Sequence, residues 1–135
     1  MTAPPFRTVM LIDDCDADNF FHGIVINRSG IALAVRVFEW AEKALEWFRA
    51  NPHHDVDLIL LDINMPRMDG FEFLDAFHRL PQENQGEAKI CMLSSSPLGA
   101  DRERAMVYPR VSDFVVKPLE DASLHQIANL RNIRM

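Results

Sequence analysis

Five short apolar runs alternate along the chain with five segments of helical pattern, and this alternation constrains the fold more than any other feature. The runs cover residues 8–12, 32–38, 57–61, 89–93 and 113–116. They are nearly all apolar throughout rather than at every second residue, which indicates strands buried on both faces. Strands that alternate with helices predict an α/β fold, here a doubly wound parallel sheet with helices on both faces.

The segments between the runs carry helical spacing or loop chemistry. Helices are expected over residues 16–27, 39–50, from Gly70 through Phe77, 101–107 and 121–131. Loops are expected at residues 81–87 and 94–99, where proline and glycine interrupt the pattern. In the first helix, the helical spacing of the apolar residues Phe20, Phe21, Ile24 and Val25 extends the expected helix to about Asn27.

Composition excludes several classes of protein. The 135 residues, of which 48% are hydrophobic, fit one globular domain over residues 1–135. The net charge of −6 and the absence of a basic cluster argue against nucleic-acid binding. No apolar run approaches the roughly 20 residues that span a bilayer. Cys15 and Cys91 have no partner at metal or redox spacing, which favours a reducing, cytoplasmic location.

Polar side chains gather where the expected strands end. Asp13 and Asp14 follow the first strand, Asp62 the third, Ser94 the fourth and Lys117 the fifth. The carboxyl ends of parallel strands meet at one edge of a doubly wound sheet, and ligands bind there. We therefore expect these five side chains to lie in one crevice.

The chemistry of such a crevice can be inferred from its charges. Three carboxylates repel one another and need a counter-charge, of which Lys117 supplies one unit. Mg²⁺ prefers hard oxygen ligands and binds through a few carboxylates together with phosphate oxygens. A metal, an ammonium and a hydroxyl also match the needs of an incoming phosphoryl group. Asp62 would then be the nucleophile that forms an acyl phosphate.

The acidic run over residues 13–18 has simpler interpretations. Acidic residues gather at helix N-termini, so Asp16 and Asp18 suit the cap and first turn of a helix. A calcium loop at Asp14-x-Asp16-x-Asp18 is rejected, because Asn19 stands where that loop needs glycine and Val25 where it needs glutamate. The five histidines, scattered without metal spacing, are expected at the surface or its boundary.

Four motifs, each closing an expected strand, resemble those of the receiver domain of bacterial two-component response regulators. They lie at residues 11–14 (Leu-Ile-Asp-Asp), 60–70 (from Leu-Leu-Asp to Met-Asp-Gly), 93–95 (Leu-Ser-Ser) and 113–118 (ending in Lys-Pro). The resemblance runs from about Thr8 to Leu130. It implies a flavodoxin-like sheet with strand order 2-1-3-4-5.

The resemblance also implies a role for each site residue. Asp62 would be the phosphoacceptor and a Mg²⁺ ligand. Asp14 would bind the metal directly and Asp13 mainly through water, with the backbone carbonyl of Asn64 completing the protein's share. Lys117 would pair with Asp62 at rest and with the phosphate later.

The implied switch consists of Ser94 and Phe114. Ser94 would swing toward the phosphoryl oxygen, and Phe114 would turn inward as the hydroxyl moves. Many relatives carry threonine and tyrosine at these two positions. The Lys117–Pro118 bond resembles the cis bond of the family; cis bonds occur almost only before proline.

The expected function is that of a stand-alone response regulator. Its donor would be a histidine kinase or histidine phosphotransfer protein, and it would catalyse only its own phosphorylation and dephosphorylation. Output would be contact with an unknown downstream protein or onward phosphotransfer, so a chemotaxis-like effector and a phosphorelay intermediate both stay open, as do a monomer and a weak homodimer. The alternative is an aspartyl-phosphate phosphohydrolase of the haloacid-dehalogenase type, which Asp14-Cys15-Asp16 imitates weakly. A receiver fold that no longer phosphorylates is a third reading.

Overall fold

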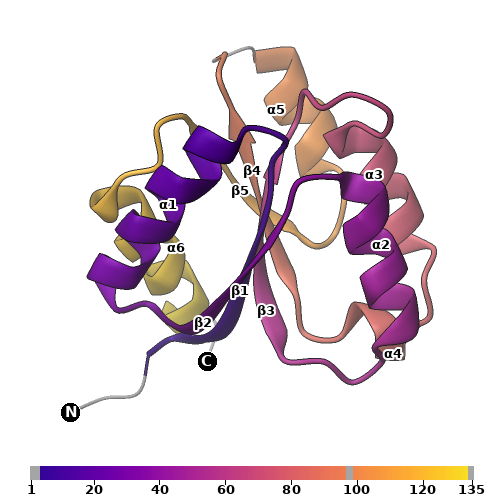
Figure 1. The fold of residues 1–135 in the computed structure, drawn as a ribbon, viewed down its shortest axis with the longest axis horizontal. Helices are drawn as coiled ribbons and strands as arrows, with labels where there is room; N and C mark the ends of the chain where they lie inside the picture. Colours follow the sequence, from indigo (N-terminus) through magenta and orange to yellow (C-terminus); the bar gives the residue numbers. More distant parts are fainter. Residues whose placement is uncertain (1–3, 97–98, 134–135) are drawn as a thin grey trace.

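A parallel sheet of five strands forms the centre of the protein (Figure 1). The computed structural model describes residues 4–96 and 99–133. The strands lie in the order β2-β1-β3-β4-β5, which confirms the doubly wound arrangement expected from the sequence. Their bounds are β1 Phe6–Ile12, β2 Ala32–Phe38, β3 Val56–Asp62, β4 Lys89–Ser94 and β5 Val111–Val116.

Helices cover both faces of the sheet (Figure 1). On one face lie α1 (Asp16–Ser29) and α6 (Asp121–Ile133). On the other lie α2 (Ala41–Ala50), α3 (Gly70–His78), α4 (Gln82–Gln85) and α5 (Gly99–Met106). Helix α5 begins two residues earlier than the sequence indicates. The loop expected at 94–99 is described only in part, because residues 97–98 lie outside the described chain. No helix within residues 4–96 and 99–133 has the length and apolar character needed to cross a membrane.

The loop prediction for residues 81–87 was wrong, because this segment contains the short helix α4. Its polar residues Asn84 and Gln85 are buried, and they face inward rather than toward solvent. The Asn84 amide donates to the carbonyl of Phe48 at 2.8 Å, and the Gln85 amide donates to that of Leu80 at 2.8 Å. The polar composition favoured a loop here, but these side chains hydrogen-bond to backbone carbonyls at the ends of the neighbouring helices.

Two apolar layers hold the helices onto the sheet. Successive residues of a strand point to opposite faces, so Val9 and Leu11 pack on the side of α1 and α6, whereas Met10 and Ile12 pack on the other side. The layer on the side of α2 to α5 contains the large buried rings of α2 and α3, namely Phe48, Phe73 and Phe77. Strands β1, β3 and β4 are buried along nearly their whole length.

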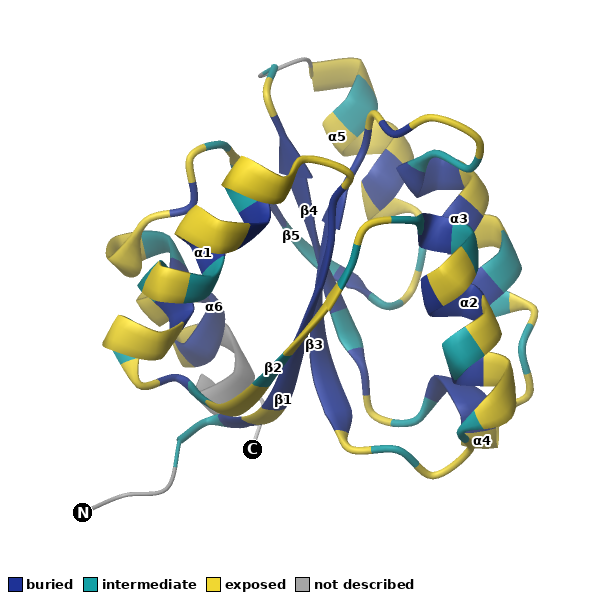
Figure 2. Cartoon of the chain, in the orientation of Figure 1, coloured by how far each residue is buried: buried dark blue, intermediate teal, exposed yellow. Residues whose placement is uncertain are grey.

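Strand β2 departs from the expected burial on both faces. It is the outermost strand beside β1, and Figure 2 shows it mostly exposed. The side chains of Leu33 and Val37 are 71% and 48% exposed. The helices cover the middle of the sheet, so an apolar strand at its edge keeps part of its surface in water.

The buried face of α1 is not the one that carries most of its large apolar side chains. Phe20, Phe21 and Ile24 are exposed by 74%, 47% and 39%. The buried residues of this helix are instead Asn19, His22 and Ile26. His22, expected at the surface, is only 1% exposed. Helix α1 is therefore rotated about its axis so that polar residues face the sheet, near the carboxyl ends of the strands.

Candidate functional site

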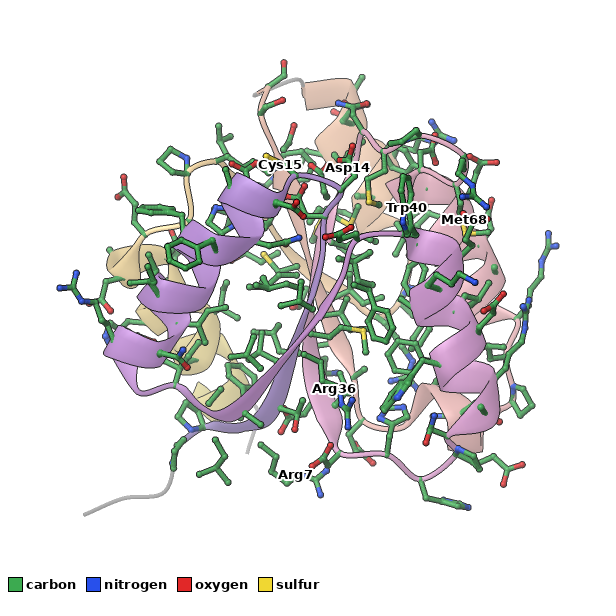
Figure 3. All side chains as sticks on the ribbon, in the orientation of Figure 1. Arg7, Asp14, Cys15, Arg36, Trp40 and Met68 are labelled. Atoms are coloured by element: carbon green, nitrogen blue, oxygen red, sulfur yellow. The ribbon has the colours of Figure 1, made fainter. Side chains whose placement is uncertain are left out.

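Three carboxylates meet at the carboxyl edge of the sheet. Asp13 and Asp14 follow β1, and Asp62 is the last residue of β3. One oxygen from each of the three lies within 4.8 Å of the others. Asp13 and Asp62 are buried, whereas Asp14 is exposed. Figure 3 shows Asp14 and Cys15 at this edge, beside the start of α1.

Lys117, which follows β5, brings the positive charge into this cluster. Its Nζ lies 2.7 Å from Asp13 Oδ2 and 3.2 Å from Asp62 Oδ1. It also lies 2.9 Å from Asp18 Oδ2, in the first turn of α1. From the sequence, Asp16 and Asp18 were expected at the cap and first turn of this helix. Both lie in its first turn, and the N-cap residue is Cys15, whose side chain makes no capping bond. The contact of Asp18 with Lys117 was not expected.

The charges of the cluster are incompletely balanced. Burial raises the pKa of Asp62 to about 6, and the nearby negative charge of Asp13 adds to the rise. Lys117 opposes the shift, but it shares its charge among three carboxylates. Burial would lower the pKa of Lys117, yet the hydrogen bonds to Asp13 and Asp18, together with the negative charges of Asp62 and Asp13, outweigh burial and raise it. Lys117 therefore stays protonated while Asp62 ionises at an unusually high pH.

Backbone hydrogen bonds join the strand ends that carry these side chains. Lys117 N donates to Ser94 O at 2.7 Å, and Ile63 N donates to Leu93 O at 3.2 Å. Asp13 N donates to Phe38 O at 3.1 Å, which extends the pairing of β1 and β2 by one residue. The site is thus built on continuations of the sheet rather than on long loops.

Gly70 fixes the segment after Asp62. Its N–H donates to Ile63 O at 2.8 Å, so the start of α3 lies directly against the end of β3. A Cβ at position 70 would lie 2.6 Å from the backbone oxygen of Asp62. Asp69 and Glu72 close the start of α3 with a reciprocal capping box. Only glycine permits this close approach.

Two polar residues of α1, Asn19 and His22, hydrogen-bond to backbone segments that carry the site. The Asn19 amide donates to Asp13 O at 2.7 Å. His22 Nε2 accepts from Leu119 N at 3.3 Å, and burial lowers the pKa of this imidazole. Sequence reasoning missed both residues. The signal was present as positions 18, 19 and 22, which share one side of a helix and carry polar side chains.

The two expected switch residues are both buried. Ser94 Oγ donates to Ser96 O at 2.6 Å and accepts from Ser96 N at 3.0 Å, so its hydroxyl is engaged with its own loop. Phe114 is 8% exposed and packs in the apolar layer on the side of α2 to α5. The peptide bond between Lys117 and Pro118 is cis, as expected.

The cluster fits a small divalent cation. Its carboxylates are close enough to share one ion, and the pKa of Asp62 is raised by burial and also by the negative charge of Asp13. Hard oxygen ligands of this kind suit Mg²⁺. Asn64 is exposed in the segment after Asp62, and the role of its carbonyl stays a prediction.

Comparison with known proteins identifies the family. A family model described as the response regulator receiver domain matches residues 9–129. The chain belongs to this family. The resemblance inferred from the motifs is therefore confirmed, and the match leaves the haloacid-dehalogenase alternative without support.

Relatives of known structure share the whole receiver fold. A two-component response regulator from Cytophaga hutchinsonii is 28% identical, with a TM-score of 0.84 over 95% of this chain and 98% of that one. A response regulator receiver protein from Dyadobacter fermentans is also 28% identical, with a TM-score of 0.83 over 93% and 98%.

Curated relatives are longer proteins. The signal transduction histidine-protein kinase BarA of Escherichia coli is 28% identical over 120 residues, which are 89% of this chain but 12% of BarA. The cyclic di-GMP phosphodiesterase response regulator RpfG of Xanthomonas campestris is 33% identical over 108 residues, which are 77% of this chain and 27% of RpfG. The comparison therefore concerns their receiver domains.

Proposed function

We propose that this receiver domain accepts a phosphoryl group on Asp62 and signals through altered contacts with other proteins. The observation that carries the proposal is the placement of Asp62 beside Asp13, Asp14 and Lys117 at the carboxyl edge of the sheet. A carboxylate in such a position can act as a nucleophile while its neighbours stabilise the charge of the transferred group.

The donor would be a phosphohistidine of a histidine kinase or phosphotransfer protein. An Asp62 oxygen attacks phosphorus, the new P–O bond forms, and the P–N bond breaks to release the imidazole. The pKa of about 6 leaves Asp62 largely ionised, and so nucleophilic, at neutral pH. Lys117 stays protonated and can contact an equatorial oxygen of the phosphoryl group. Water later attacks the acyl phosphate and restores the carboxylate.

Mg²⁺ would be held by Asp13, Asp14 and Asp62, with the carbonyl of Asn64 as a further ligand. When bound, the ion supplies positive charge that neutralises the phosphoryl oxygens. The orientation of the Asp13 carboxylate is fixed in part by the backbone, because its Oδ1 accepts from Cys15 N at 3.0 Å. Asp14 is exposed and is the most accessible of the three carboxylates.

The switch would begin at Ser94. Its hydroxyl exchanges the carbonyl of Ser96 for a phosphoryl oxygen, which moves the segment after β4. Ser94 pairs with Val116 and Met92 pairs with Phe114, so the neighbouring strand β5 lies directly in reach of that movement. Output would then be binding of a downstream protein or onward phosphotransfer.

The phosphodonor would contact the outer face of α1. This helix begins beside the site, and its residues Phe20, Phe21 and Ile24 are exposed although they are apolar. A groove between α1 and the start of α6 continues this surface and is lined by Phe21, Val25 and Leu119 among others. A protein that delivers a phosphoryl group to Asp62 must cover this edge of the sheet. The exposed apolar side chains of α1 would then be buried against that protein.

The test is phosphorylation of the purified protein by acetyl phosphate and by histidine kinases of the host. Asp62→Asn should abolish labelling, and removal of Mg²⁺ by EDTA should abolish it in the unaltered protein. Asp55→Asn is the control, because Asp55 is an exposed carboxylate at the opposite end of β3. Labelling that persists in Asp62→Asn, or that never occurs in the unaltered protein, would contradict the proposal.

A further inference from the structure

Lys117 is bound most closely by carboxylates that are not the phosphoacceptor. Its Nζ donates to Asp13 Oδ2 at 2.7 Å and to Asp18 Oδ2 at 2.9 Å. The distance to Asp62 Oδ1 is longer, at 3.2 Å. An ammonium has three donors, so all three contacts can be made at once. Asp18 comes from α1 and belongs to none of the motifs by which the site was predicted.

Asp18 is well placed to fix a flexible side chain. A lysine ammonium sits on a four-carbon stem, and its position is defined only by what it binds. Asp18, in contrast, projects from the first turn of a helix that is attached to the strand ends on both sides. The Asn19 amide binds Asp13 O at 2.7 Å, and His22 binds the N–H of Leu119, two residues after Lys117, at 3.3 Å. The distance between the Asp18 and Lys117 backbones is thereby set.

We infer that Asp18 is a positioning residue for Lys117 in phosphoryl transfer, a role that rests on the proposed function of Asp62. When Asp62 becomes an acyl phosphate, its own contact with Lys117 must open to admit the phosphoryl oxygens. Asp13 and Asp18 then remain as the anchors that keep the ammonium beside the transferred group. Asp13 would at that stage also serve the metal, whereas Asp18 is not among the proposed metal ligands and keeps its ion pair with Lys117.

Two effects of Asp18 must be separated by experiment. One is its contact with Lys117, and the other is its plain negative charge near a cation site. Asp16 offers a matched control, because it lies in the same helical turn, is exposed, and faces Glu39 instead. Asp18→Asn and Asp16→Asn remove the same charge at similar places, but only the first removes the carboxylate that binds Lys117.

The experiment compares the unaltered protein with Asp18→Asn, Asp16→Asn and Asp18→Glu. The first readout is the rate of phosphorylation by acetyl phosphate, measured over a range of donor and Mg²⁺ concentrations. The second is the ¹⁵N and proton signal of the Lys117 ammonium, which is readily assigned because the chain has three lysines, Lys43, Lys89 and Lys117. Urea unfolding of each variant shows that the fold is retained.

Asp18→Asn should lower the maximal rate about tenfold, because the acting group is misplaced rather than the donor bound more weakly. It should also shift the Lys117 signal or hasten its exchange with water. Asp16→Asn should leave both readouts unchanged, and Asp18→Glu should restore part of the rate because it keeps a carboxylate.

A maximal rate in Asp18→Asn within twofold of that in Asp16→Asn would overturn the inference, as would an unchanged Lys117 signal. Both results leave the proposed function intact if Asp62 is labelled. Absence of labelling in the unaltered protein would instead overturn the proposed function, and with it the part assigned to Asp18.

Discussion

The two ends of the sheet hold buried polar groups in different ways. At the amino end, the Asp57 carboxylate accepts from the backbone N–H groups of Arg7 and Thr8, at 2.8 and 3.3 Å. His54 Nδ1 accepts from Val56 N at 3.1 Å, so Nε2 carries the proton and donates to Asn84 O at 2.8 Å. Figure 3 shows Arg7 at this end and Asp14 at the other.

At the carboxyl end, by contrast, carboxylates face one another. One ammonium serves three of them, and the pKa of Asp62 is raised as a result of burial and of the charge on Asp13. At the amino end, backbone N–H groups and the Arg7 side chain, whose Nε lies 3.9 Å from Asp57 Oδ2, balance the carboxylate, whereas the crowded carboxylates at the other end leave charge that a ligand can neutralise. Strongly shifted ionisable groups are typical of functional sites for this reason. The polar groups at the amino end stabilise the fold, whereas the raised pKa of Asp62 at the carboxyl end lowers stability at neutral pH in a way that fits its proposed role as a nucleophile.

Among the polar groups at the two ends of the sheet, the largest effect on stability is expected at the amino end. Asp57→Ala leaves the buried N–H of Thr8 and the partly buried N–H of Arg7 without their carboxylate, and should lower the free energy of unfolding by about 3 kcal/mol. Urea denaturation measures the loss, with the exposed neighbour Asp55→Ala as the control. A loss below about 1 kcal/mol would mean that the contrast between the two ends is drawn wrongly.

A smaller effect of the opposite sign is expected at Asp62. Its pKa is about 6 in the fold against an ordinary value of 3.8, so the folded protein holds the proton more tightly than the unfolded chain does. Stability due to this group is therefore present at low pH and lost as the pH rises through about 6. Asp62→Asn should be more stable than the unaltered protein by about 2 kcal/mol at neutral pH.

The pH dependence of that difference is the sharper measurement. The gain from Asp62→Asn should shrink as the pH falls from about 6 to about 4 and vanish below, because both proteins are then neutral at this position. Other titrating groups cancel in the comparison of the two proteins. A gain that is independent of pH, or a loss at neutral pH, would show that Lys117 compensates Asp62 fully.

The smallest effect on stability is expected on the outer face of α1, next to the carboxyl end. Phe20 is 74% exposed, so Phe20→Ser should change the free energy of unfolding by less than about 0.5 kcal/mol. Ile26→Ala, on the buried side of the same helix, should cost about 2 to 4 kcal/mol. Phe20→Ser should nevertheless slow labelling by a phosphodonor protein while leaving labelling by acetyl phosphate unchanged. Equal slowing by both donors would assign Phe20 to the fold rather than to a docking surface.

The strand order was implied by the family resemblance, whereas the meeting of Asp13, Asp14, Asp62 and Lys117 was predicted from the residues for a physical reason. Each of these residues directly follows an apolar run, and parallel strands necessarily end at the same edge. A local pattern and one topological rule were sufficient. The distances within the cluster then follow from the sheet, not from details of side-chain packing.

The burial pattern of α1 could not be derived in the same way, because no local rule fixes how a helix is rotated about its axis. Phe20, Phe21 and Ile24 fall at helical spacing but stay exposed. The helix instead buries Asn19, which bonds the nearby Asp13, and His22, which bonds Leu119, 97 residues further along the chain. The role of a residue that depends on such partners, Asp18 among them, can be inferred only when the positions of the strand ends are known.

The contact of Gly70 with the end of β3 has a practical consequence for anyone who scans this protein by mutation. Position 70 carries no functional group, yet even alanine there would displace the peptide that bears Asp62, the proposed phosphoacceptor. Loss of activity at this glycine would look like loss of a catalytic residue. The remedy is a measurement of Mg²⁺ binding beside that of activity, since a displaced main chain disturbs both, whereas a missing side chain elsewhere in the pocket can spare one of them.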